Sequence, residues 1–108
     1  SFEKETAILR RKAPDLEGGI ASELCAMAAR LREEPLRKPP GAAETIDWAR
    51  AVVELRNGSG GDTEDGVSRE TVRSTIGCLL KEAEDVERVD EAMVTELLEA
   101  AETARSEP

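Results

Sequence analysis

The stretch of sequence that decides the fold is residues 37–50, which read Arg-Lys-Pro-Pro-Gly-Ala-Ala-Glu-Thr-Ile-Asp-Trp-Ala-Arg. Proline fixes φ and glycine permits unusual φ, so residues 38–41 predict a stiff, specified corner rather than a floppy loop. The helix that follows Gly41 should run to about Arg56, and it carries the single tryptophan, Trp48. Because apolar residues cover much of its circumference, this helix should be central, with Trp48 in the core. Its start, beside basic residues, is a candidate anion site.

Amphipathic patterns on both sides of this stretch predict an all-α bundle of four to five helices, with no strand. A first helix should span Glu3–Lys12, with Ala7 and Ile8 turned inward. It should end before Pro14, because the residue preceding a proline avoids the α region.

A second helix is indicated by one apolar stripe at spacings of three and four, formed by Leu16, Ile20, Leu24, Met27 and Leu31. Asp15 is a suitable N-cap, whereas Gly18 and Gly19 weaken the first turn and favour a start near Ile20. We expect this helix to end around Glu34, before the next proline.

The C-terminal half predicts two more helices, the first of them capped by Ser68. A break between them is expected near Glu84–Asp85, although no glycine or proline marks it. Residues 59–66 are glycine-rich and polar and should form a flexible loop. We expect residues 1–105 to form one helical domain and residues 106–108 to be a disordered tail.

The charge of the chain is strongly negative and unevenly placed. The 108 residues carry 15 basic and 24 acidic side chains, a formal net charge of −9. Residues 1–56 are neutral, so the excess lies in residues 57–108. Such a chain should not bind nucleic acid non-specifically, and its acidic half is either a solvated face or a patch for a basic partner. No apolar run is long enough for a membrane span and no signal peptide is visible, so we expect no membrane partner.

The residue types for common catalysis are missing. There is no histidine, so we expect no metal site, no nucleophile–base pair and no catalytic residues. Cys25 and Cys78 should be buried free thiols in a reducing cytoplasm, with a disulfide between them as the alternative. Gly58–Gly61 lacks the Lys and Ser or Thr of a phosphate-binding Walker loop. Four basic residues form a cluster: Arg30, Arg32, Arg37 and Lys38. They are either solvated surface or flank a phosphate or an acidic neighbour.

Residues 38–51, Lys-Pro-Pro-Gly-Ala-Ala-Glu-Thr-Ile-Asp-Trp-Ala-Arg-Ala, resemble a characteristic segment of one branch of the MoxR-type AAA+ ATPases. This branch is similar to the CoxD protein of carbon monoxide dehydrogenase maturation. Residues 70–81 and 84–89 resemble a second segment of the family. Residues 2–14 resemble the entry to its C-terminal lid, and the order and spacing agree over most of the chain.

The resemblance implies the small helical lid of a AAA+ ATPase, cut away from its αβα nucleotide-binding core. This fragment would have no cofactor of its own and would not be an enzyme, while the core of the parent protein would carry ATP and Mg. The lid would close over the nucleotide and pass its state to its own core and to neighbouring subunits of a hexamer. The family implies a chaperone-like role in the bacterial cytoplasm, often with a partner that contains a von Willebrand factor A domain.

Many AAA+ lids place a sensor arginine at the start of the helix that faces the γ-phosphate. In this chain the first four residues after Gly41 are Ala-Ala-Glu-Thr, with no arginine among them. The resemblance therefore marks as nucleotide-proximal Lys38, Pro40, Gly41, Glu44 and Thr45. Lys38 or backbone N–H groups could replace the arginine, while Glu44 could pair with a basic group or assist a metal-bound water. The alternative is a stand-alone helical interaction module that docks a basic partner on its acidic C-terminal half.

Overall fold

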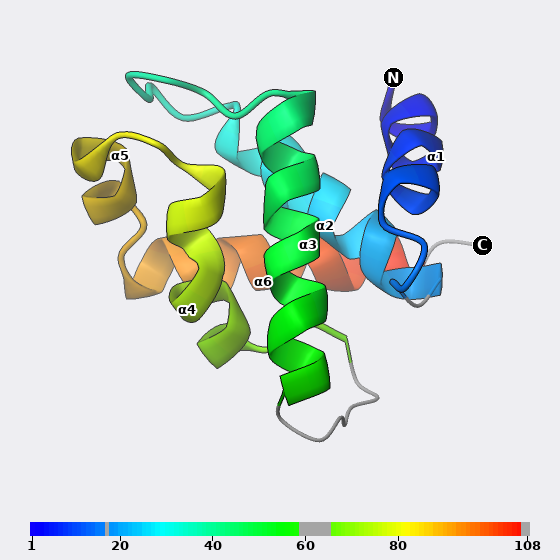
Figure 1. Ribbon diagram of the computed structural model, residues 1–108. Helices are drawn as coiled ribbons and strands as arrows, with labels where there is room; N and C mark the ends of the chain where they lie inside the picture. The colour runs from blue at the N-terminus through cyan, green and yellow to red at the C-terminus, as the bar shows by residue number, and fades with distance from the viewer. Residues whose placement is uncertain (17, 59–65, 107–108) are drawn as a thin grey trace.

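The chain forms six α-helices in a computed structural model that describes residues 1–16, 18–58 and 66–106 (Figure 1). No strand occurs in these ranges, so the all-α prediction is confirmed, with six helices in place of four to five. The helices are α1 (Phe2–Lys12), α2 (Gly18–Leu31), α3 (Ala42–Gly58), α4 (Arg69–Leu79), α5 (Ala83–Arg88) and α6 (Glu91–Ser106). Residues 59–65 of the glycine-rich loop and residues 107–108 of the tail lie outside the described residues, and α6 extends through Ser106.

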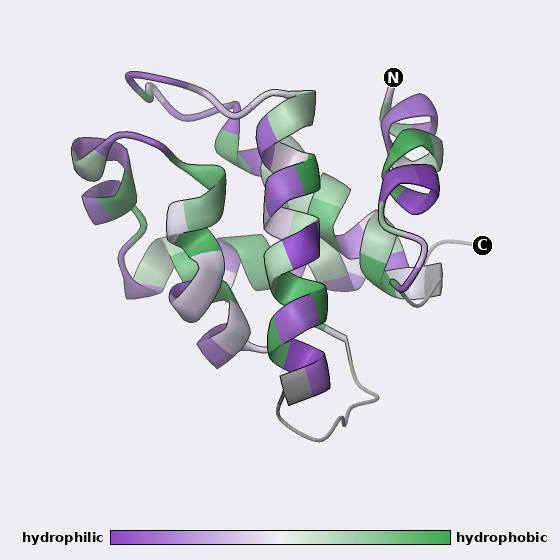
Figure 2. Ribbon diagram, viewed as in Figure 1, coloured by the Kyte–Doolittle hydropathy of each residue, from purple (hydrophilic) through white to green (hydrophobic). Residues whose placement is uncertain are grey.

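Two helix pairs make most of the packing. The helix α2 packs along α6, and α3 packs on α4. The helix α1 contacts both α2 and α3, and α3 also contacts α2 and α4. The most extensive helix contacts are those of α2 rather than those of α3, and the apolar Leu55 of α3 is exposed. In Figure 1 the segment between α2 and α3 crosses one end of the molecule, and Figure 2 shows that this segment is largely hydrophilic.

The core is aliphatic apart from Trp48, which is the largest fully buried side chain. Its indole N–H donates to the hydroxyl of Thr75 on α4 over 2.7 Å, and that hydroxyl donates to the carbonyl of Thr71 over 2.7 Å. Both buried polar groups are thereby satisfied. The other fully buried apolar side chains of largest volume are Leu9, Leu24, Met27, Leu31, Leu79, Leu80, Leu97, Val52, Val72 and Val94.

The inward face of α1 differs from the predicted one. Ala7 is exposed and Ile8 is half-buried, while Thr6 and Leu9 face the core. Thr6 can be buried because its hydroxyl donates to the carbonyl of Phe2, one helical turn back, over 2.9 Å.

The bounds of α2 also differ from the prediction. The helix begins at Gly18, so Asp15 is not its N-cap, and it ends at Leu31 rather than near Glu34. The N–H groups of residues 33 and 34 bond three residues back, at 3.1 and 3.0 Å, which tightens the chain out of the α-helix ahead of Pro35. The predicted apolar stripe from Ile20 to Leu31 is buried.

The C-terminal helices break at places other than the predicted one. The helix α4 ends at Leu79, and Glu84–Asp85 lies inside the first turn of α5. A second break precedes α6, where the carboxylate of Asp90 accepts a bond from the N–H of Met93 over 2.9 Å and caps the helix. Neither break contains glycine or proline, so the strongest sequence signals for a helix end are missing there.

Both cysteines are free. Cys25 is buried as predicted, whereas Cys78 is only half-buried. Burial raises the pKa of the Cys25 thiol above its ordinary value of 9.0, against a smaller opposite effect of its hydrogen bond with Thr6. Cys25 is therefore an inert, protonated thiol at neutral pH.

The buried carboxylate of Glu23 on α2 fixes the chain just before α4. It accepts a bond from the N–H of Val67 over 3.0 Å and forms an ion pair with Arg105 of α6 at 3.7 Å. Gly66 has a φ of +80°, and a Cβ there would lie 2.6 Å from a carboxylate oxygen of Glu23. Glycine is therefore required at this position by both backbone conformation and space.

Replacing Gly66 by alanine should lower the free energy of unfolding by roughly 1–3 kcal/mol, because the new Cβ strains the backbone and displaces Glu23. Gly77→Ala is the matched control, since a Cβ at that exposed position of α4 meets nothing within 4 Å. The control should be neutral or stabilising by up to about 1 kcal/mol. Urea denaturation measures both, and a Gly66→Ala variant as stable as Gly77→Ala would contradict the prediction.

Replacing Thr75 by valine should lower the free energy of unfolding by about 1–3 kcal/mol, because it leaves the buried indole N–H of Trp48 without an acceptor. Thr103→Val makes the same change at an exposed position of α6 and should have little effect. Thermal unfolding followed by circular dichroism compares the two, and equal midpoints would show that the bond contributes nothing to stability.

Candidate functional site

The corner, defined as residues 37–41, is the second half of the segment between α2 and α3 and leads directly into α3 (Figure 1). Its two prolines have no N–H, so its backbone donors are the N–H groups of Arg37, Lys38 and Gly41. All three donate to carboxylates of the same chain, the first two to Asp85 and the third to Glu44. The corner is therefore held by acidic side chains as well as by proline stiffness.

Asp85 receives two of these bonds from the first turn of α5. Its side chain is 1% exposed, with Oδ1 2.8 Å from the N of Arg37 and Oδ2 2.9 Å from the N of Lys38. Burying a carboxylate is costly unless hydrogen bonds satisfy it, and two backbone donors supply that compensation here.

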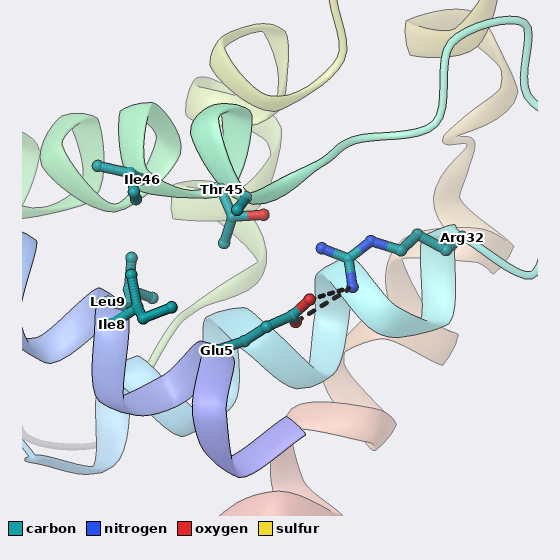
Figure 3. A pocket seen from close by; sticks show the side chains of 7 residues that line it. Glu5, Ile8, Leu9, Arg32, Thr45 and Ile46 are labelled. Carbon is teal, nitrogen blue, oxygen red and sulfur yellow. Dashed lines mark hydrogen bonds and ion pairs between the residues drawn. The ribbon is translucent and has the colours of Figure 1, made fainter. Parts of the chain in front are cut away.

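Arg32 holds the other side of the corner. Its Nε donates to the carbonyl of Pro40 over 2.7 Å, and its Nη1 lies 3.2 and 3.3 Å from the two carboxylate oxygens of Glu5 on α1. Figure 3 shows this pair beside a recess between α1 and α3. The recess is small, with a cavity volume of about 20 Å³, and its other lining residues are Ile8, Leu9, Ala42, Thr45 and Ile46.

The start of α3 is capped by its own side chains. The N–H of Gly41 donates to Oε1 of Glu44 over 2.9 Å, and the Gly41 carbonyl accepts from the Thr45 hydroxyl over 2.9 Å. The Gly41–Glu44 bond is one of the two bonds of a capping box, the one in which the side chain at the third helical position accepts the N–H of the N-cap residue. The φ of Gly41 is not positive, so the conformational reason predicted for this glycine is wrong. A Cβ at Gly41 would lie 3.2 Å from Oε1 of Glu44, so the absence of a side chain makes room for the cap.

The cap fixes the charge of Glu44. The hydrogen bond from the N–H of Gly41, and then that from its own N–H, holds the pKa of Glu44 below its ordinary value of 4.5, with smaller contributions from Lys38 and Lys81. A negative charge is thereby held at the positive end of the α3 dipole.

The predicted basic cluster is not one cationic patch. Its three arginines pair with carboxylates: Arg30 with Glu34 and Glu96, Arg32 with Glu5, and Arg37 with Glu84. Lys38 is exposed, and its ammonium has no hydrogen-bond or ion-pair partner in the ranges that the structure describes. Lys38 is therefore the member of the cluster that can offer its charge to a ligand.

The five residues predicted near a nucleotide do not form one surface. Gly41, Glu44 and Thr45 form the cap of α3, and Pro40 is buried with its carbonyl on Arg32. The N–H groups of the corner are engaged, so they are not donors for a phosphate. The N–H groups of residues 42 and 43 have no acceptor among the described residues, and with Lys38 they are the donors left for an anion.

Asp85 is the residue of this site that sequence reasoning did not single out. It stands among exposed acidic residues of the C-terminal half, and a run of acids gives no sign of which one is buried. The one feature of the sequence that points to Asp85 is its position in residues 84–89, one of the segments that resemble the MoxR-type family.

Comparisons of the sequence with protein-family models, with curated proteins and with solved structures find no match. Within the described ranges, no helix has both the length and the apolar character needed to cross a membrane. The same ranges contain no group of three or more His, Cys, Asp or Glu side chains that could hold a metal ion. Functional inference therefore rests on the residues and contacts described above.

Replacing Glu44 by glutamine should lower the unfolding midpoint at pH 7, because the charged cap is lost. A carboxylate with a lowered pKa stabilises the folded state fully above pH 4.5, and this stabilisation is lost as the pH falls below that value. The difference from wild type should therefore shrink in acid. Glu54→Gln, the same change at an exposed position of α3, is the control. Parallel pH dependence in both variants would contradict a charged cap at Glu44.

Proposed function

We propose that this chain is the non-catalytic C-terminal lid of a MoxR-type AAA+ ATPase of the CoxD-like branch. It closes over ATP and Mg bound by a core outside this sequence and relays the nucleotide state within a chaperone-like ring. Its own core and the neighbouring subunits, in a hexamer, are the partners, with a von Willebrand factor A domain protein as a further one. A bacterial cytoplasmic setting belongs to the same proposal.

The observation that carries the proposal is that the segments resembling this family are partners of one another in the fold. Residues 38–51 meet residues 70–81 through the buried Trp48–Thr75 bond and residues 84–89 through the Lys38–Asp85 bond. Ile8, from the third segment, lines the same recess as Ile46. Segments matched separately along the chain therefore form one structural unit around the corner.

Within this proposal Lys38 is the residue that meets the nucleotide. Its exposed ammonium lies close enough to the start of α3 to contribute to the lowered pKa of Glu44. A phosphate at this helix start would meet Lys38 and the N–H groups of residues 42 and 43, and it would be opposed by the Glu44 carboxylate.

The second candidate is a helical interaction module that docks a basic partner on its acidic C-terminal half. The net charge of −9 favours it. Many of those acids already serve the fold, however, by pairing with arginines, holding the corner or capping a helix: Glu82, Glu84, Asp85, Asp90, Glu91 and Glu96. Four of these six are exposed members of surface ion pairs and stay accessible to a basic partner, so the lid is preferred because the segments that resemble the family meet in the fold.

The coding sequence upstream of residue 1 separates the two candidates. A Walker motif within roughly the preceding two hundred residues, a length suited to one core domain, is expected for the lid. An upstream frame without one overturns the lid and favours the interaction module.

In the full-length protein, Lys38→Ala should weaken binding of a fluorescent ATP analogue by roughly three- to tenfold, because it removes one charge–phosphate contact. Lys12→Ala, an exposed lysine on α1, is the matched control and should bind like wild type. Equal affinity of the Lys38→Ala and Lys12→Ala proteins would show that the corner does not sense the nucleotide.

A further inference from the structure

The corner is tied to three residues of the C-terminal half between positions 82 and 85. Asp85 accepts the N–H groups of Arg37 and Lys38, the Arg37 side chain donates to Glu84 over 3.1 Å, and the same side chain lies 4.0 Å from Glu82. The last two are exposed ion pairs, which contribute little. The buried Asp85 is therefore the contact that fixes the corner against this half of the chain.

The helix that carries Asp85 is the least embedded of the six. It has only six residues, and it is absent from the extensive helix–helix contacts, which join α1, α2, α3, α4 and α6. Its apolar contribution is the half-buried Val86, with Val89 directly after it. A short helix with little packing can shift at low cost to the rest of the core.

We propose that Asp85 is the positioning residue of the corner, so that the corner and the Lys38 ammonium move together with α5. The two carboxylate oxygens hold adjacent peptide groups and so fix the orientation of both. The prolines that follow have fixed φ, which limits how far the corner can absorb a displacement at Lys38. The proposal rests on the lid function for the ligand of Lys38, whereas the coupling of α5 to the corner stands on the geometry alone.

Amide hydrogen exchange tests the coupling in this chain. Asp85→Asn keeps the side-chain shape but replaces one acceptor oxygen by a donor NH₂ group, so at least one amide of Arg37 and Lys38 should exchange about tenfold faster or more. Glu23→Gln is the matched control: it alters the other buried carboxylate that accepts a backbone N–H, remote in sequence from the corner. It should leave those two amides as protected as in wild type, after correction for global stability.

Two outcomes would overturn the coupling. In the first, Arg37 and Lys38 stay fully protected in Asp85→Asn. In the second, they open only to the same extent as the amides of α2 and α6, which would reduce the role of Asp85 to general stability.

A double-mutant cycle in the full-length protein tests the consequence for the ligand, with the fluorescent ATP analogue as probe. Asp85→Asn should weaken binding in the wild-type background and have little further effect beside Lys38→Ala, since it acts through Lys38. Equal losses in both backgrounds would overturn the positioning role. If Lys38→Ala alone binds normally, the role of Lys38 in nucleotide binding fails, and the exchange experiment still decides whether Asp85 positions the corner.

Discussion

The buried carboxylate of Asp85 is the interaction on which the arrangement of the corner depends. A charged group that is 1% exposed is tolerated only with strong partners, and Asp85 finds them in two consecutive backbone N–H groups. Glu23 uses the same solution at Val67, where the chain approaches α4. Phe2 and Trp48 are the only aromatic residues of the sequence, so the core is built mainly of aliphatic side chains. Its connecting segments at the corner and before α4 are held by the buried carboxylates of Asp85 and Glu23.

The prolines determine how many partners the corner needs. Pro39 and Pro40 remove two backbone donors, and each of the remaining three N–H groups meets a carboxylate. Arg32 then satisfies the carbonyl of Pro40 and carries the connection to α1. The stiffness that prolines give to a loop is thus completed by acceptors from α3 and α5, which both follow the corner in the sequence.

Periodicity was enough to predict the helical class, the buried stripe of α2, the place of Trp48 and a helix starting after Gly41, because these depend on local patterns. It failed where a long-range contact decides. Asp85 was placed at a helix break, since nothing in a run of acidic residues shows that one of them binds backbone amides some 47 residues away. Gly41 was valued for the unusual φ that glycine permits, but its φ is not positive, and the residue makes room for a side chain three positions later. The Arg30–Glu34 pair has the local spacing of four residues, whereas the pairs of Arg30 with Glu96, Arg32 with Glu5 and Arg37 with Glu84 join distant segments and were equally beyond local reasoning.

At the start of α3, the same residue that stabilises the helix opposes the binding of an anion. Glu44 stabilises the helix because its charge lies at the positive end of the dipole and accepts the N–H of Gly41. That charge also repels any anion approaching the N–H groups of residues 42 and 43. A phosphate would therefore depend on Lys38, an exposed ammonium without a partner among the described residues, whose backbone is held from α5. Lys38 would thus supply the charge for an anion, while Asp85 of α5 fixes the backbone position of Lys38. A change in α5 would then alter the affinity for that anion without any change in the residues that touch it.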